Sequence, residues 1–118
     1  MIKKELNNLD WKERFVYLKD IPFDENDLQQ KGSKFQIVKF QPKTSIKPHY
    51  HKKTTEIFYV RSGEAIMKFN NKEILAKKDD IFLCQPNDVH EVINNSDEEF
   101  ILLIFKTNEE ENDLYWEE

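Results

Sequence analysis

Apolar and polar residues alternate in short runs along most of this chain, and the runs recur about every 8 to 12 residues. A period of two places every second side chain on one face of an extended segment, so each run predicts a half-buried β-strand. Asn70 and Asn71 separate two runs and suit a two-residue hairpin loop that needs positive φ. This rhythm is typical of an all-β sandwich or barrel. We expect strands over residues 15–18, 34–40, 45–51, 56–60, 64–69, 72–75, 80–84, 90–94 and 100–105.

The alternation weakens toward both ends of the chain. The N-terminal part is mostly polar, and a loop is expected over residues 20–32. The C-terminal end is strongly acidic, although Leu114, Tyr115 and Trp116 are suited to dock on the barrel or on a neighbouring subunit. We therefore expect an N-terminal extension with one strand and a loop (1–34), a barrel (35–106) and an acidic tail (107–118).

Composition narrows the class of protein. A chain of 118 residues with 38% hydrophobic and 13% aromatic residues suits one small β-rich core. The net charge of −5 offers no basic surface for nucleic acid, and no apolar run reaches membrane-spanning length. The N-terminus lacks the apolar segment of a secretory signal. Cys84 is the only cysteine, so we expect no disulfide within the chain and a cytoplasmic location.

All three histidines belong to one pattern, in which His49 and His51 precede Glu56 and His90 opens a later strand. Residues i and i+2 of a strand point to the same face, so His49 and His51 can share one interior. Neutral imidazole and carboxylate are ligands that Fe, Mn, Ni, Cu and Zn ions all accept. Four protein ligands on an octahedral metal leave two positions for a substrate or dioxygen. The pattern therefore favours a divalent metal site.

These residues resemble the first conserved motif of the cupin superfamily, G-x5-H-x-H-x3,4-E-x6-G. Lys43 takes the place of the first glycine, and both gaps around Glu56 match through to Gly63. Lys43 follows Pro42, and we expect a turn without positive φ there. The first motif is therefore complete in its metal ligands and departs from the family only in its opening turn.

The second cupin motif, G-x5-P-x-G-x2-H-x3-N, resembles residues 79–94. Asp79 and Asn87 replace its two glycines, while His90 and Asn94 match directly. Asn and Asp tolerate positive φ better than other non-glycine residues, so these two replacements are conservative for the backbone. Asn94 is expected to be a structural hydrogen-bonding residue.

The resemblance implies a double-stranded β-helix, the cupin jelly-roll barrel of two antiparallel sheets. It also implies a divalent metal, of unknown identity among Fe, Mn, Ni, Zn and Cu, held by His49, His51, Glu56 and His90. Related proteins are commonly homodimers in which an N-terminal strand crosses to the partner, and the strand at 15–18 is our candidate.

Strand parity predicts the surroundings of this site. If Glu56 and His90 point inward, then Phe58, Met67 and Val92 ring the metal and form a largely apolar cup. Few charged side chains are expected to face the metal, which disfavours a strongly anionic substrate such as a polyphosphate. The loops can supply cations at Lys47, Lys52 and Arg61.

Two functions remain open on these grounds. One is a metal-dependent enzyme on a small organic substrate, of the dioxygenase or isomerase type; the other is a non-catalytic module that binds or senses a small molecule. A structural or storage role is weaker, because it needs no intact ligand set. The sequence identifies no catalytic residue and no organic cofactor site. Tyr17, Tyr50 and Tyr59 are candidates for proton transfer, and Cys84 is expected to be a buried apolar residue rather than a ligand or nucleophile.

Overall fold

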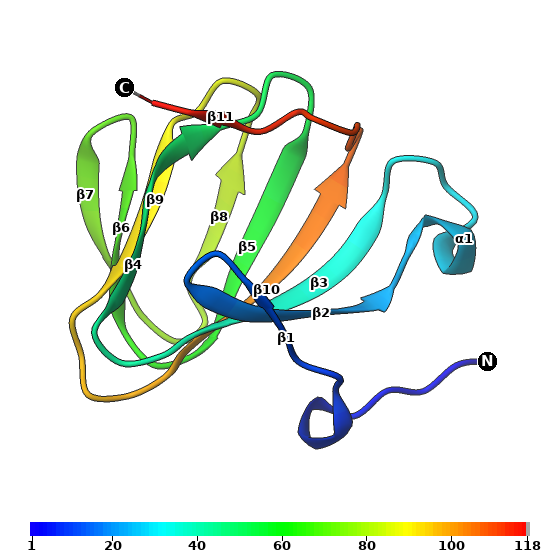
Figure 1. Ribbon diagram of the computed structural model, residues 1–118, viewed down its shortest axis with the longest axis horizontal. Coiled ribbons are helices and arrows are strands. Elements are labelled where there is room, and N and C mark those ends of the chain that lie inside the picture. The colour runs from blue at the N-terminus through cyan, green and yellow to red at the C-terminus, as the bar shows by residue number, and fades with distance from the viewer. Residues whose placement is uncertain (118) are drawn as a thin grey trace.

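The computed structural model describes residues 1–117, and these consist mainly of antiparallel strands (Figure 1). Within these described residues, helix is limited to a 3-10 turn at Leu6–Asn8 and the single turn α1 (Glu25–Leu28). No helix within residues 1–117 is long and apolar enough to cross a bilayer. The strands are β1 (Lys12–Arg14), β2 (Tyr17–Phe23), β3 (Lys34–Phe40), β4 (Thr44–Tyr50), β5 (Thr55–Ser62), β6 (Ala65–Phe69), β7 (Lys72–Ala76), β8 (Ile81–Cys84), β9 (His90–Asn94), β10 (Phe100–Thr107) and β11 (Tyr115–Trp116).

The strands form two antiparallel sheets that face each other across the core. Sheet A has the order β1-β2-β3-β10-β5-β8, and sheet B has the order β11-β4-β9-β6-β7. Several neighbours in each sheet are far apart in sequence, as in β3 beside β10 and β4 beside β9, so the chain passes repeatedly between the layers. The expected all-β fold, a double-stranded β-helix, is confirmed. Strands from both the N-terminal extension and the acidic tail join the sheets, and the division at residues 34 and 106 stays a prediction.

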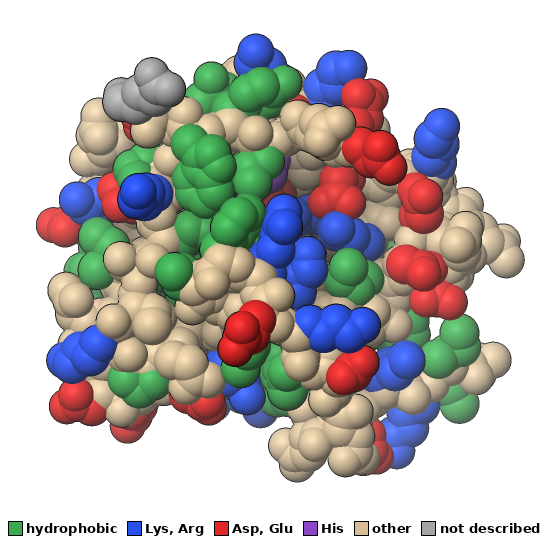
Figure 2. All heavy atoms as spheres, in the orientation of Figure 1, with side chains coloured by type: hydrophobic (Ala, Val, Ile, Leu, Met, Phe, Trp, Pro, Cys, Tyr) green, Lys and Arg blue, Asp and Glu red, His purple; other side chains and the backbone are tan. Residues whose placement is uncertain are grey.

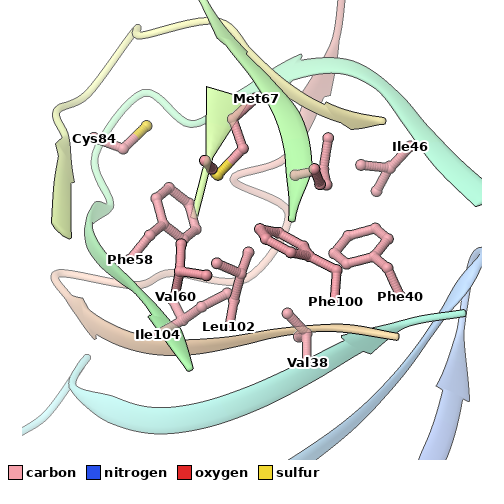
Figure 3. Close-up of a cluster of buried hydrophobic side chains, with 13 residues drawn as sticks. Val38, Phe40, Ile46, Phe58, Val60, Met67, Cys84, Phe100, Leu102 and Ile104 are labelled. Atoms are coloured by element: carbon pink, nitrogen blue, oxygen red, sulfur yellow. The ribbon is translucent and has the colours of Figure 1, made fainter. Parts of the chain in front are cut away.

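Alternating burial along the central strands builds the core. In β9 and in the first half of β10, every second residue is buried. The inward side chains include Val60, Met67, Phe100 and Leu102, all almost fully buried (Figure 3). Burying an aliphatic or aromatic side chain of this size contributes about 1.5–3 kcal/mol. Several residues of this core, such as Phe58 and Val92, also line the cavity that holds the polar groups described below.

Several turns contain non-glycine residues with positive φ. The hairpin expected at Asn70 and Asn71 is confirmed, with φ of 51° and 69°. Asp79 and Asn87 have φ of 73° and 72°, so they keep the conformation that glycine has in the motif. The expectation for Lys43 was wrong, because its φ is 62°. Its ammonium group bonds the backbone carbonyl of Asn95, a contact that holds the strained turn in place.

The N-terminal strand lies later than the alternation predicts. Phe15 has φ of 54° and belongs to the turn between β1 and β2, so the expected strand at 15–18 was wrong in its bounds. β2 instead runs through Pro22 to Phe23, into the segment expected as a loop. A register shift after Asp20 accommodates the proline, which cannot donate to the ladder. β2 pairs with β3 of its own chain, and a crossing to a partner stays a prediction.

Candidate metal centre

Three strands and one loop bring the predicted ligands together. His49 on β4 lies directly opposite His90 on β9, and their ring centroids are 4.2 Å apart. A β-bulge between Ile46 and His49 precedes this pair and sets the direction of His49. Each of His49, His51 and His90 has a ring nitrogen within 4.8 Å of one on both others. The strand spacing in the sequence therefore does place the three imidazoles at one site.

The three imidazoles contact the backbone through the same ring nitrogen, Nδ1. Their Nδ1 atoms contact backbone carbonyl oxygens: His49 with Lys47 at 2.8 Å, His51 with Asp113 at 2.6 Å, and His90 with Asp88 at 3.0 Å. A carbonyl only accepts hydrogen bonds, so each Nδ1 carries the proton. Each neutral ring then presents the lone pair of Nε2, as metal-binding histidines do.

Glu56 reaches this group from β5 of the opposite sheet. Its Oε1 atom lies 2.9 Å from Nε2 of His51 and 3.5 Å from Nε2 of His90. Within the described residues, this buried oxygen has no aligned hydrogen bond. Lone pairs of a carboxylate and a neutral imidazole repel each other at 2.9 Å, so a proton or a metal cation must lie near this contact. The donor set therefore fits a divalent transition metal.

The electrostatics keep Glu56, His49 and His90 in the states that metal binding needs, whereas His51 is held toward its protonated state. Burial alone raises the pKa of Glu56, but His51, Lys106 and His90 outweigh it and lower the pKa below its usual range. Burial lowers the pKa of His49 to about 4, and it also lowers the pKa of His90. For His51 burial is again the largest influence, but the adjacent Glu56 carboxylate reverses it and raises the pKa. Glu56 is therefore ionised and His49 and His90 are neutral at neutral pH.

A single acidic residue of the C-terminal tail holds the loop between two ligands. The buried carboxylate of Asp113 accepts hydrogen bonds from the amides of Lys52, Lys53 and Thr54 at 2.8–3.0 Å, and from the Thr54 hydroxyl at 3.0 Å. Its backbone carbonyl accepts from His51. Just beyond it, β11 pairs with β4, so the expected docking of the tail is confirmed on its own chain. Sequence reasoning missed Asp113 because it is one carboxylate among many in an acidic segment.

A cavity of about 200 Å³ opens beside the candidate ligands. Phe58 and Val92 line it as expected, but Met67 lies in the core and does not. The expectation of few charged side chains was wrong, and the three cations suggested from the loops do not line the cavity. Figure 2 shows Lys and Arg side chains gathered beside a hollow in which histidine is visible. The cationic side chains that line the cavity are Arg14, Lys19, Lys34 and Lys106.

The three tyrosines differ in position. Tyr17 lines the cavity, and burial raises the pKa of its phenol. Tyr50 stacks on Tyr115 with ring centroids 5.4 Å apart, and Tyr59 bonds the Asp79 carboxylate on the other side of sheet A. Neither lines the cavity. Tyr17 is thus the tyrosine placed to exchange a proton with a ligand.

Cys84 is buried as expected, and Asn94 has the structural role expected of it. The Cys84 sulfur lies 3.3 Å from Nδ1 of His90, and burial raises the pKa of its thiol, so the thiol is a poor nucleophile. Cys84 also forms, with Glu56 and His90, a second group whose ligand atoms lie within 4.8 Å of one another, so the expectation that Cys84 is not a ligand stays a prediction. The amide of Asn94 donates to the backbone carbonyls of Phe40, Gln41 and Glu98, which ties the β9–β10 turn to β3.

The fold and the donor set define a small jelly-roll protein with a candidate metal centre. Residues 36–106 match the cupin domain family, which is more than half of the 118 residues. The chain therefore belongs to the cupin family. An oxalate-binding protein from Thermotoga maritima is 29% identical over 79 residues. That match spans 65% of this chain and 65% of the relative, slightly under two thirds of its length.

Two solved structures illustrate the likeness of fold. A Thermotoga maritima protein described as a predicted oxalate decarboxylase superposes with a TM-score of 0.83 at 16% identity, over 92% of this chain and all of that one. The polyketide cyclase RemF from Streptomyces resistomycificus superposes with a TM-score of 0.84 at 14% identity, over 98% of this chain and 84% of that one. At such identities the likeness establishes the fold alone.

Proposed function

We propose that this cupin binds one divalent transition metal through His49, His51, Glu56 and His90 and holds a small organic ligand at it. The observation that supports this most directly is the contact of all three Nδ1 atoms with backbone carbonyl oxygens. It directs three Nε2 lone pairs and one unpartnered carboxylate oxygen to a common region. Fe, Mn, Ni, Zn and Cu ions all accept these donors.

The proposed chemistry is that of an enzyme of the dioxygenase or isomerase type. A bound metal would supply Lewis acidity or a site for oxygen. The protein itself supplies a partly enclosed cavity, with Phe58 and Val92 in its lining, that limits the access of water to the ligand. Tyr17 holds its phenolic proton at neutral pH and can donate a hydrogen bond to a ligand oxygen.

A non-catalytic binding or sensing module is the second candidate. The observation that favours it is the likeness to a relative named an oxalate-binding protein. Incubating the metal-loaded protein with a candidate ligand and analysing the mixture separates the two functions. An enzyme converts the ligand, whereas a binding module returns it unchanged.

Oxalate is a direct probe of the proposed function, because its carboxylates chelate divalent metals. We expect calorimetric titration to show oxalate binding to the metal-loaded protein and at least about tenfold weaker binding to the metal-free protein. The His49→Ala/His90→Ala variant is the control for chelation by stray metal. Equal oxalate affinity with and without metal would show that the ligand does not use the metal centre.

We also propose that the chain forms a homodimer through the outer face of sheet A. The supporting observation is an exposed apolar cluster: Ile81 and Leu83 on the edge strand β8 are 65% and 58% exposed, beside Ile57 on β5. Antiparallel sheets of monomers usually place polar residues on their outer face. Sedimentation equilibrium should give about twice the chain mass of 14.3 kDa, and Leu83→Glu should restore the single-chain mass. The control Leu75→Glu, at an exposed position of β7, should keep the dimer mass. A wild-type protein with the single-chain mass would refute the dimer.

A further inference from the structure

Three lysines face the cavity from neighbouring strands of sheet A. Lys34 on β3 and Lys106 on β10 are direct cross-strand partners, and their side chains are only 16% and 12% exposed. Lys19 on β2 lies opposite inward-facing Val38 and lines the same cavity. Folding therefore collects several ammonium groups in one partly enclosed space next to the candidate metal centre.

The carboxylates within reach do not balance this charge. Glu109 pairs with Lys34 at 2.7 Å and with Lys106 at 3.3 Å, and Glu56 lies 3.9 Å from Lys106. Within residues 1–117, no carboxylate oxygen lies within 4 Å of the Lys19 ammonium. Lys19 therefore has a positive charge without a counterion in this part of the chain.

Two further acidic groups lie at the cavity wall, but other contacts occupy them. Asp113 accepts four hydrogen bonds from the loop between His51 and Glu56. Glu110 pairs with Lys53 at 2.9 Å, on the solvent side. Neither carboxylate is oriented to neutralise the lysines.

Lys19 is the lysine whose charge is unfavourable without an anion beside it. The like charges of Lys34 and Lys106 lie directly opposite each other, which destabilises a sheet, but Glu109 pairs with both of them. Burial, followed by the charges of Lys34 and Lys106, lowers the pKa of Lys19 to about 8. An anion among these ammonium groups would relieve the repulsion and form charge-assisted hydrogen bonds.

An independent observation at the same wall also indicates a ligand. Gln36 follows Lys34 by two residues on β3, so both point into the cavity. Its side chain is 97% buried (3% exposed), yet its Oε1 has no hydrogen-bond partner among the described residues. Buried polar atoms in native proteins rarely lack a partner, and a ligand hydroxyl is a donor that Oε1 can accept.

We propose that the cavity binds a small hydroxylated anion, whose carboxylate or phosphate head group lies on Lys19 and Lys34 and whose hydroxyl donates to Gln36. The head group occupies the lysine side of the cavity, and the oxygens of its other end face the histidines. This inference rests on the proposed function for the ligand's position at the metal. It does not depend on the metal for the recognition of the head group.

Three probes that share a three-carbon skeleton test this proposal: D-glycerate, glycerol 3-phosphate and uncharged glycerol. Each is titrated calorimetrically into the metal-loaded full chain, as wild type, Lys19→Met, Gln36→Leu and Lys72→Met. Lys72 is an exposed lysine of β7 away from the cavity, so its variant matches the charge change of Lys19→Met. Metal content and thermal unfolding are measured on the same samples.

We expect at least one anion to bind the wild type about tenfold or more tightly than glycerol, and Lys19→Met to remove that advantage. Gln36→Leu should weaken the anion severalfold, and Lys72→Met should not change it. Lys19→Met should unfold at the wild-type temperature or above, because it removes a repulsion. The tighter of the two anions identifies the head group as carboxylate or phosphate.

The proposal is overturned if neither anion binds more tightly than glycerol, or if Lys19→Met and Lys72→Met bind the anions alike. Failure of the proposed function looks different. In that case the wild type takes up no metal, while the anion still binds in a lysine-dependent way. Conversely, the wild type can bind one metal per chain while Lys19→Met binds the anions as tightly as the wild type does. That result would refute the proposed anion site and would still support the metal centre.

Discussion

Replacing Gly63 with alanine is expected to destabilise the protein by about 3–5 kcal/mol. Gly63 has φ of +82°, a conformation that costs an L-residue roughly 1–2 kcal/mol. An added Cβ would also run into the backbone carbonyl of Glu99, which cannot move aside as a side chain can. A domain of this size has about 5–15 kcal/mol of total stability, so the loss is a large fraction. Urea unfolding followed by circular dichroism measures it.

Gly32→Ala is the matched control for this prediction. Gly32 has nearly the same φ, +80°, but the nearest atom to an added Cβ is 3.2 Å away. Its cost should therefore be limited mostly to the backbone conformation, about 1–2 kcal/mol. Equal losses at the two glycines would contradict the argument that the close approach of Glu99 makes Gly63 necessary.

Removing the Asp113 carboxylate is expected to cost about 2–4 kcal/mol and to weaken metal binding. Asp113→Ala leaves three backbone amides and the Thr54 hydroxyl without their acceptor, in the loop that connects His51 to Glu56. Chemical unfolding and a metal titration measure the two effects. Glu111→Gln, at an exposed acid of the same segment, is the control and should change neither.

The effect of Asp113→Ala should also depend on pH. Burial acts to raise the pKa of this carboxyl, but hydrogen bonds from Lys52, Lys53 and Thr54 lower it below its usual value. Since the folded pKa lies below the unfolded value of about 3.9, the carboxylate stabilises the fold above that pH. The contribution disappears as pH falls through the folded pKa. A difference between variant and wild type that grew on acidification would contradict this role.

The central strands were predictable because they depend on a local rule, and the histidine cluster was predictable because its residues resemble the two cupin motifs. A period of two determines which side chains share a face, and it placed Glu56, Phe58 and Val60 on the inward face of β5. The same rule placed His90 and Val92 together on β9. These strands are buried on one side, and so their register is strongly specified by the pattern.

The three lysines that face the cavity (Lys19, Lys34 and Lys106) were not predictable as a group, because their proximity depends on which strands are neighbours and not on sequence spacing. Lys19 enters the cavity only because β2 pairs with β3, and the start of that strand was predicted incorrectly at Phe15. Lys34 and Lys106 are more than 70 residues apart and become partners through the β3–β10 ladder. Asp113 reaches its loop in the same non-local way, since β11, which follows it, pairs with β4.

Lys43 shows a different limit of sequence reasoning. A lysine disfavours positive φ, yet Lys43 keeps the backbone conformation of the glycine that the family motif has at this position. Contacts of the side chain with the Asn95 carbonyl and with Asp97, 3.4 Å away, help to hold this strained position. Tertiary contacts thus override a local preference worth about 1–2 kcal/mol.

The central claim is that His49, His51, Glu56 and His90 bind one metal ion. Elemental analysis by plasma mass spectrometry tests it most directly, on protein purified without chelators or a histidine tag, beside the His49→Ala/His90→Ala variant. We expect close to one Fe, Mn, Ni, Cu or Zn per wild-type chain, and loss of that metal from the variant with its β-sheet circular dichroism retained. Absence of metal from reconstituted wild type, or equal metal in both proteins, would contradict the claim.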